Sequence, residues 1–259
     1  MTTRMPAVFL GHGNPMLALL DTDVTRRWQM LGQALPRPKA ILAISAHWYL
    51  PQTAVTAMAQ PRTIHDFGGF PRALYSVAYP CPGDPQFAAE VARRLAPEGV
   101  ESDLAWGLDH GTWAVLRHLY PAADIPVIQL SLDARLAPHR HYARAKRLAS
   151  LREEGVLILG SGNIVHNLAL ARWEKDPAPY DWAERFDTWV RQRIEAGEHA
   201  PLLEMEAFGE DGQRAVPTPE HYLPLLYVLG VKEDNDSVGF PVSGIDMGSI
   251  SMTAVQMGG

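Results

Sequence analysis

Short apolar runs alternate along this chain with segments that have the periodicity of amphipathic helices. The apolar runs predict strands over 6–11, 39–48, 52–58, 126–132 and 155–162. The amphipathic segments predict helices over about 17–34, 84–96, 111–120, 138–153 and 181–197. Nearly continuous apolar strands between helices are typical of a sheet covered on both faces. We therefore predict an α/β fold whose central sheet is mixed and mostly parallel, with helices on both faces.

The C-terminal segment has a different pattern. From residue 235 onward, polar and apolar residues alternate, which predicts an antiparallel strand pair at an edge of the sheet. The sequence contains no internal repeat and no long linker, so we expect a single domain over residues 1–259. The Pro-rich stretch 59–85 is the longest irregular segment, and we interpret it as a functional loop rather than a domain boundary.

Charge, apolar run length and cysteine content argue against several classes of protein. A net charge of −6 argues against nucleic acid or an anionic membrane surface as the main partner. The apolar run near the N-terminus, PAVFL, is too short for a signal peptide, and no apolar stretch is long enough to span a membrane. Cys81 is the only cysteine, which excludes an intrachain disulfide and fits a cytoplasmic protein. We interpret it as a structural thiol rather than a nucleophile.

Four of the ten histidines lie at the end of a predicted strand or near the start of a helix. They are His12 in FLGHGNP, His47 in AISAHW, His166 in LILGSGNIVHN and His221 in PTPEHYLPLL. Ligands of open α/β sheets gather outside the carboxyl ends of the strands, so we expect His12, His47 and His166 to converge on one crevice. Each histidine alone is more simply explained as a hydrogen-bonded core or loop residue. Together they favour a metal site, because neutral imidazole is the commonest zinc ligand and also suits iron.

The segment 217–224 allows two helix starts. In the first, Thr218 caps a helix and Pro224 falls in its second turn, where the proline ring opposes a helical carbonyl. In the second, the helix starts near Leu223 and leaves His221 on the preceding loop, free to point at a metal. We favour the second.

The remaining histidines differ in their settings. His110, in GLDHGTW, precedes a predicted helix, and the adjacent Asp109 is a candidate orienting partner. His65, in the irregular loop, is a weaker candidate for lining a pocket. The other four fall on predicted helices or polar stretches, where we expect them to face solvent: His118, His139, His141 and His199.

Five motifs carry a family resemblance across nearly the whole chain. In order they are GHGNP, SAHW, DHGTW, GSGNIVHN and TPEHYLPLL. Together they resemble the class III extradiol ring-cleaving dioxygenases, and the match is closest to the 4,5-DOPA extradiol dioxygenase group. The resemblance implies an α/β fold and a non-haem metal site that uses ferrous iron, Fe(II), for catalysis. It also implies that zinc, Zn(II), is sometimes the metal found in the purified protein.

The same resemblance assigns roles to individual residues. His12, His47 and His221 match metal ligands, and His110 matches a pocket histidine with a catalytic role. His166 matches a histidine that serves either as the acid/base residue or as a further metal contact. Many class III members use two histidines and one carboxylate, so an exchange between His221 and the adjacent Glu220 stays open.

The implied chemistry needs a metal with open positions, an acid/base and a flat apolar pocket. His166 suits the acid/base role because the ordinary imidazole pKa of about 6.5 lies near working pH. Candidate pocket walls are the aromatic residues beside the motifs: Trp48, Tyr49, Trp113 and Tyr222. Each of them is equally well explained as a core aromatic.

We therefore expect one catalytic domain that inserts both atoms of O2 into a catechol such as DOPA and opens the ring outside the hydroxyls to a muconic semialdehyde. Its partners would be a small aromatic substrate and O2. Two alternatives stay open. A zinc hydrolase would use the same histidines to activate water, with Glu220 as the base, although the chain contains no HExxH motif. A non-catalytic scaffold relative is disfavoured because all five clustered histidines are present.

Overall fold

The computed structural model describes residues 4–96 and 99–259. Residues 1–3 begin the stretch that we predicted not to be a signal peptide, and they lie outside the described residues. Within the described part of the chain, no helix combines the length and the apolar character needed to cross a membrane.

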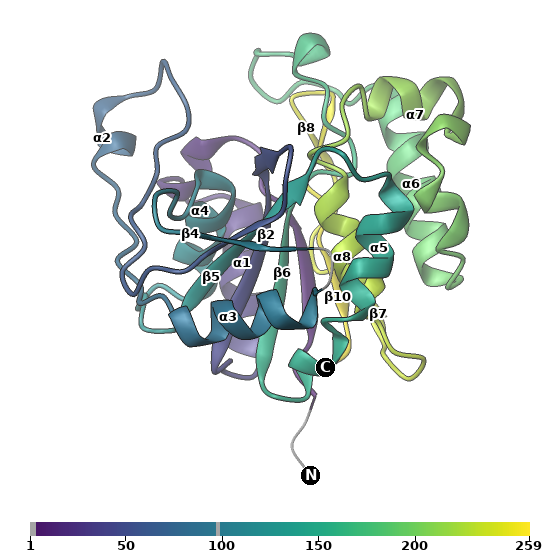
Figure 1. The fold of residues 1–259 in the computed structure, drawn as a ribbon. Coiled ribbons are helices and arrows are strands. Elements are labelled where there is room, and N and C mark those ends of the chain that lie inside the picture. The colour runs from purple at the N-terminus through teal and green to yellow at the C-terminus, as the bar shows by residue number, and fades with distance from the viewer. Residues whose placement is uncertain (1–3, 97–98) are drawn as a thin grey trace.

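A sheet of eight strands forms the centre of the molecule, in the order β4-β3-β5-β2-β6-β1-β10-β7 (Figure 1). Its parallel middle consists of β5 (Val127–Asp133), β2 (Ala40–Leu50), β6 (Val156–Gly162) and β1 (Ala7–Gly11). On one side β3 (Ala54–Thr56) runs antiparallel to β5 and parallel to β4 (Glu101–Asp103). On the other side β10 (Val255–Met257) and β7 (Val238–Gly239) continue the sheet antiparallel. The predicted mixed, mostly parallel sheet is confirmed.

Helices cover both faces of this sheet (Figure 1). One face packs against α1 (Asp23–Ala34) and α4 (His110–Leu119). The other packs against α3 (Pro85–Arg94), α5 (Pro138–Lys146), α6 (Asp181–Glu195) and α8 (Leu223–Gly230). Consecutive side chains of β1 alternate between the two cores, since Val8 joins the first and Phe9 the second. The strands are therefore apolar on both faces, as their sequences predicted.

Two predicted helices are divided in the structure. The region 17–34 holds a short 3-10 turn, η1 (Pro15–Ala18), and then α1. Thr22 starts α1 because its hydroxyl accepts from the backbone N–H of Thr25 while the Thr25 hydroxyl accepts from the backbone N–H of Thr22, a capping box. The region 138–153 likewise holds α5 and the 3-10 turn η2 (Ala149–Arg152).

The C-terminal segment forms more than the predicted strand pair. β10 and β7 pair antiparallel at the edge of the large sheet, as expected. Between them, β8 (Ile245–Asp246) and β9 (Ile250–Ser251) form a separate hairpin. Asp187 on α6 holds this region, because its carboxylate accepts from the hydroxyls of Ser251 at 2.6 Å and Thr253 at 2.8 Å. Burial raises the pKa of Asp187, although these hydrogen bonds oppose the rise.

The segment 59–85 is mostly irregular, and its regular parts are the short helix α2 (Arg72–Tyr75) and one bridge from Thr63 to Leu108. Cys81 is buried within it, and burial raises the pKa of its thiol to about 12. A buried thiol of this kind is unreactive, in agreement with its predicted structural role.

The expectation that four histidines face solvent is confirmed only for His139. His141 is fully buried and its Nδ1 lies 3.2 Å from the hydroxyl of Tyr227, so the prediction was wrong there. The reason is that the inner face of α5 packs against α8, and His141 lies on that face. His118 and His199 are half-buried. The remaining short helical elements of the described residues are η3 (Leu168–Leu170), η4 (Ala200–Leu203), η5 (Met205–Ala207) and α7 (Gly209–Ala215).

Candidate metal centre

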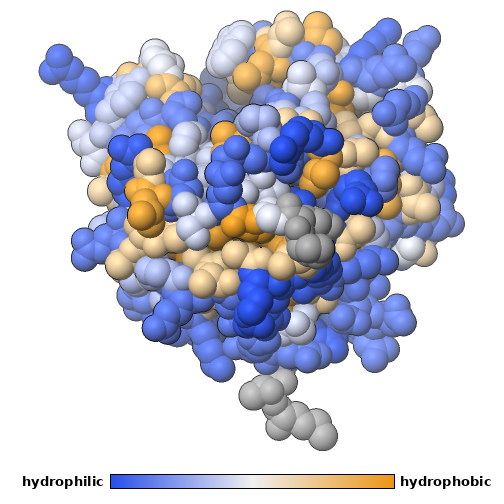
Figure 2. Space-filling view, viewed as in Figure 1, coloured by the Kyte–Doolittle hydropathy of each residue, from blue (hydrophilic) through white to orange (hydrophobic). Residues whose placement is uncertain are grey.

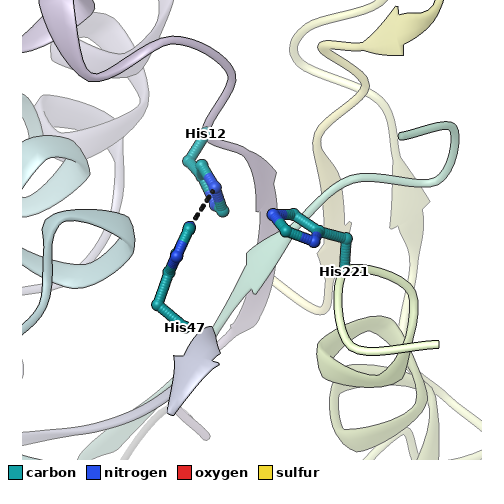
Figure 3. A group of neighbouring side chains, drawn as sticks. All are labelled: His12, His47 and His221. Atoms are coloured by element: carbon teal, nitrogen blue, oxygen red, sulfur yellow. Dashed lines mark hydrogen bonds between the residues drawn. The ribbon is translucent and has the colours of Figure 1, made fainter. Parts of the chain in front are cut away.

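Three histidines meet at the carboxyl end of the parallel strands (Figure 3). His12 directly follows β1, and His47 lies near the end of β2. The β2–β5 register shifts between Ile44 and Tyr49, and such an irregularity re-aims the side chains around it. His221 lies on the loop before α8, which begins at Leu223. The second of the two helix starts is therefore the one observed.

Glycines let the chain segments of the site approach one another. A Cβ added at Gly162, at the end of β6, would lie 2.1 Å from the backbone oxygen of His221. That oxygen accepts a hydrogen bond from the backbone N–H of Asn163 at 2.8 Å. Gly13, after His12, adopts a φ of +57°, which favours glycine. The glycines noted beside the histidines therefore serve both close approach and turn formation.

The three imidazoles are arranged as a metal site requires. One nitrogen from each of His12, His47 and His221 lies within 4.8 Å of the others. The Nε2 atoms of His12 and His47 are 3.0 Å apart, and Figure 3 shows all three rings pointing toward one another. His12 and His221 are buried, whereas His47 is half-buried. Three imidazoles on one side of an open pocket can hold a divalent metal.

The groups behind the rings of His12 and His47 indicate which nitrogen of each ring is free to bind a metal. The Ser161 hydroxyl donates to the Gly111 carbonyl, so it must accept from Nδ1–H of His12, which lies 3.0 Å away. Nδ1 of His47 faces Oδ2 of Asp66 at 3.3 Å. The Asp66 carboxylate favours a proton on Nδ1 of His47, and in that tautomer the Nε2 atoms of both rings present lone pairs that a shared cation can accept. The donor set therefore fits a metal ion.

Glu220 faces the outer side of His221. Its Oε1 lies 3.3 Å from Nδ1 of His221 and accepts from the hydroxyl of Thr218 at 2.7 Å. This arrangement suits a carboxylate that orients an imidazole. The geometry therefore favours His221 over Glu220 as the third donor.

His166 lies beside the three-histidine group. Its ring stacks on that of His221 with centroids 3.4 Å apart and planes nearly parallel, and it lines the same pocket. Its backbone pairs with Ile250 of β9. The nitrogen lone pairs of two parallel stacked rings lie in parallel planes, so they do not converge on one metal ion. The position of His166 therefore suits an acid/base residue better than a fourth ligand.

Asp66 is a residue of the site that sequence reasoning missed. Its Oδ1 accepts from the backbone N–H of His110 at 2.8 Å, and its Oδ2 lies 3.0 Å from Nδ1 of the same residue. Because Oδ2 also faces His47, one carboxylate orients two imidazoles. Asp66 lies in the irregular segment 59–85, where no local periodicity signals such a contact.

Asp109 does not have the role that we expected. Its carboxylate caps α4 through the backbone N–H of Thr112 at 3.2 Å, and it accepts from Ser45 at 2.7 Å and from Gln129. Adjacent residues at a helix start point in different directions, so Asp109 turns into the core while His110 faces the pocket. Burial, and after it the nearby charge of Asp66, raises the pKa of Asp109 to about 6.

Burial keeps four of the pocket histidines neutral, namely His12, His47, His166 and His221. It lowers the pKa of His47 to about 3 and that of His166 to about 4. Burial, followed by repulsion among the histidines, lowers the pKa values of His12 and His221 well below their usual range. Neutral imidazole is the form that binds metals and accepts protons.

A pocket of about 330 Å³ opens above these histidines. The predicted aromatic walls do not line it, and neither does His65. Side chains alternate along a strand, so Trp48, next to His47, points away and stacks on Trp106. Tyr49, Trp113 and Tyr222 pack in or against the cores instead. His65 bonds the carbonyl of Val77.

Comparisons with known proteins agree with this geometry. Residues 7–252 match the family described as the catalytic LigB subunit of aromatic ring-opening dioxygenase. The chain belongs to this family. The 4,5-DOPA dioxygenase extradiol of Escherichia coli K12 is 50% identical over 261 residues, covering 99% of this chain and 96% of that protein. The enzyme of the same name from Beta vulgaris is 38% identical over 88% of this chain and 87% of its own.

A solved structure extends the likeness to three dimensions. The crystal structure of an uncharacterized protein from Escherichia coli K12 has a TM-score of 0.86 and 46% identity, and the match covers 98% of this chain and all of that one. This LigB-family protein is thus an extradiol ring-cleaving dioxygenase, and the enzyme class expected from its motifs is confirmed.

Proposed function

We propose that this LigB-family protein cleaves catechols next to their two hydroxyls, using iron(II) held by His12, His47 and His221. The observation that carries this proposal is the group of three neutral imidazoles, which place one nitrogen each within 4.8 Å of the others. The Nε2 atoms of His12 and His47 are 3.0 Å apart, a spacing that suits two ligands of one cation. They lie at the floor of an open pocket, which leaves room for a catechol and dioxygen. Residues from His12 to Ile250 contribute to the pocket, which supports one catalytic domain over the chain.

The reaction uses dioxygen as its only oxidant. The ring bond beside the hydroxyl-bearing carbons breaks, and both oxygen atoms enter the product, a hydroxymuconic semialdehyde. A product that carries an amino-acid side chain, as from DOPA, can cyclise. When bound, iron(II) supplies a redox-active Lewis acid at which the catechol oxygens and dioxygen meet. A reducing cytoplasm suits this chemistry, because iron(II) and the free thiol of Cys81 both persist there.

The chain's own residues move protons and orient the ring. His166 lines the pocket as a neutral imidazole, so it can accept a phenolic proton and return it to the opened ring. His110 lies across the pocket, fixed by two contacts to Asp66, and offers a second polar contact to the substrate. The apolar side chains around them exclude bulk water.

Metal reconstitution tests the proposal. Protein stripped of metal is reloaded anaerobically with iron(II) or, in parallel, with zinc, and each sample receives oxygen and a panel of catechols that includes DOPA. We expect one O2 consumed per catechol and a yellow ring-opened product in the iron sample alone. No oxygen uptake with any catechol would contradict the proposal. Turnover of esters or amides by the zinc sample without oxygen would support the hydrolase alternative.

A further inference from the structure

Two buried serines lie behind the proposed metal ligands, on two neighbouring strands. Ser45 of β2 and Ser161 of β6 are partners in the parallel register. Each continues a row of side chains, ending in Ala43 and Leu159, that faces α1 and α4. Hydrophilic side chains cover much of the surface that Figure 2 shows, whereas both serines are fully buried. A buried hydroxyl needs partners inside the protein, so these partners indicate what each serine does.

Ser161 connects His12 to the first turn of α4. Its hydroxyl accepts from Nδ1–H of His12 at 3.0 Å and donates to the backbone carbonyl of Gly111. The hydroxyl has one proton, and the carbonyl that receives it can only accept. The serine oxygen therefore keeps the imidazole proton on Nδ1 and leaves Nε2 of His12 free toward the pocket.

Ser45 connects the segment that carries His47 to the same turn. The register of β2 with β5 shifts between Ile44 and Tyr49, and in this interval the backbone N–H of His47 donates to the Ser45 hydroxyl at 3.2 Å. The hydroxyl itself donates at 2.7 Å to Oδ1 of Asp109, the residue that caps α4. Ser45 therefore holds the irregular end of β2 in the shape that aims His47 at the pocket.

Gly111 allows the first turn of α4 to approach the strand ends this closely. A Cβ added there would lie 2.5 Å from Oγ of Ser45 and 3.0 Å from Cδ2 of His47. Any side chain at this position would force the helix start away from the strands. The turn is also fixed from β5, because Gln129 donates to the Asp109 carboxylate. The first turn of α4 is therefore a firm support for both serines.

We propose that Ser45 and Ser161 are positioning residues for the metal ligands, and that through them the first turn of α4 holds His12 and His47 at the spacing that one cation requires. The inference rests on the proposed metal site. It gives the DHGTW motif a second task beside supplying a pocket histidine, since this turn receives both serine hydroxyls.

The metal affinity of serine variants tests the inference without turnover. Metal-free Ser161→Ala and Ser45→Ala compete for zinc with a chelator of known affinity. Without the serine oxygen, the His12 ring can carry its proton on Nε2, so we expect Ser161→Ala to bind zinc about 10- to 100-fold more weakly. Ser45→Ala removes support from the backbone of His47 rather than a contact to its ring, and we expect the lower end of that range, about tenfold.

Ser131→Ala is the matched control. Ser131 is fully buried on β5, and its hydroxyl also makes two hydrogen bonds, accepting from the backbone N–H of Ala54 at 2.8 Å and donating to the Gln52 carbonyl at 3.2 Å. We expect its loss to leave zinc affinity unchanged. Equal losses in all three serine variants would show that the hydroxyls support only the fold, which would overturn the inference. Unchanged affinity in Ser161→Ala and Ser45→Ala would overturn it as well.

The visible spectrum of cobalt-loaded protein separates positioning from stability. Cobalt(II) binds imidazole ligands, and its absorption bands depend on the number and geometry of those ligands. At saturating cobalt we expect Ser161→Ala to have altered bands, while its metal-free form melts at about the temperature of metal-free Ser131→Ala. A spectrum identical to that of the unmodified protein would contradict the positioning role.

Gly111→Ala tests the turn itself. The added methyl group would meet Ser45 and the ring of His47, so we expect zinc affinity to fall about tenfold or more. Gly239→Ala is the control, because no heavy atom lies within 4 Å of a Cβ built there. Unchanged affinity in Gly111→Ala would overturn the role of the turn. If His12→Ala and the unmodified protein bind zinc equally well, the proposed metal site itself fails, so the two failures are distinguishable.

Discussion

One carboxylate, Asp66, serves two pocket histidines. It binds His110 through two contacts and faces Nδ1 of His47. Burial alone would raise the pKa of Asp66, but the hydrogen bonds and charges of these histidines outweigh it and hold the pKa below its usual range. The carboxylate is therefore ionised at neutral pH and keeps Nε2 of His47 turned inward as a lone-pair donor.

Replacing Asp66 by Asn should weaken metal binding without unfolding the protein. An amide of the same shape removes the negative charge behind His47, so we expect metal affinity to fall about 10- to 100-fold. Competition with a chelator of known affinity, read by metal analysis, measures this. Asp124→Asn is the control, because Asp124 pairs with Arg37 at the surface. Unchanged affinity in Asp66→Asn would show that the carboxylate does not act on the metal.

His166 should affect the rate more than binding. For His166→Gln we expect kcat to fall about 10²- to 10⁴-fold with KM mostly retained, as follows from loss of an acid/base. Metal content, measured on the same sample, should stay near that of the unmodified protein, because the ring stacks on His221 rather than joining the three-nitrogen group. Loss of the metal would instead make His166 a ligand.

At the scale of elements, the packing of α5 on α8 buries a histidine. His141 is fully buried against Tyr227, and burial lowers its pKa to about 4. The unfolded chain takes up this proton below about pH 6.5, whereas the folded protein resists it down to about pH 4. The unfolded state therefore binds more protons in this window, and stability must fall as the pH falls through it.

The variant His141→Gln should remove this part of the pH dependence. In unfolding by urea of metal-free protein, we expect the unmodified chain to lose about 1.4 kcal/mol per pH unit from this group between roughly pH 6 and 4.5. The glutamine variant should lack that loss, and His139→Gln, at an exposed position, should keep it. Parallel stability curves for the unmodified protein and His141→Gln would contradict the assignment.

The elements themselves were predictable because their signals are local. Strands buried on both faces read as continuous apolar runs, and Thr22 begins α1 with a local hydrogen bond. His12, His47 and His166 could be brought together because strand ends share one edge of a sheet, whereas His221, on the loop before α8, joined them through the family resemblance. The position of Asp66 could not be predicted, because it depends on how the irregular segment 59–85 packs against the pocket. The predicted pocket walls were wrong for a different reason: neighbouring side chains of a strand point to opposite faces, so Trp48 points away from the pocket that His47 faces.

At the scale of the whole molecule, the proposed ligands tie distant parts of the chain together. His12 follows β1, His47 lies on β2 and His221 precedes α8, so a bound metal links the N-terminal and C-terminal parts of the fold. A ligand that binds only the folded state stabilises it, by about 4 kcal/mol when present at 1,000 times its dissociation constant.

Metal removal should therefore lower the melting temperature. We expect a chelator to reduce Tm by several degrees and iron(II) or zinc to restore it under anaerobic conditions, as followed by scanning calorimetry. His12→Ala should melt at nearly the same temperature with and without chelator. A chelator effect of the same size in that variant would place the stabilising metal elsewhere.

The C-terminal strands also determine at which stage of protein synthesis the pocket can form. The backbone N–H of Gly11, next to His12, donates to the Thr253 carbonyl, and Ile250 pairs with His166. β1 is likewise flanked by β10. A ribosome builds the chain from the N-terminus, so His12 and His47 leave the ribosome before the C-terminal strands that flank them in the folded protein. The nascent chain therefore cannot complete the pocket until the residues up to Thr253 have left the exit tunnel.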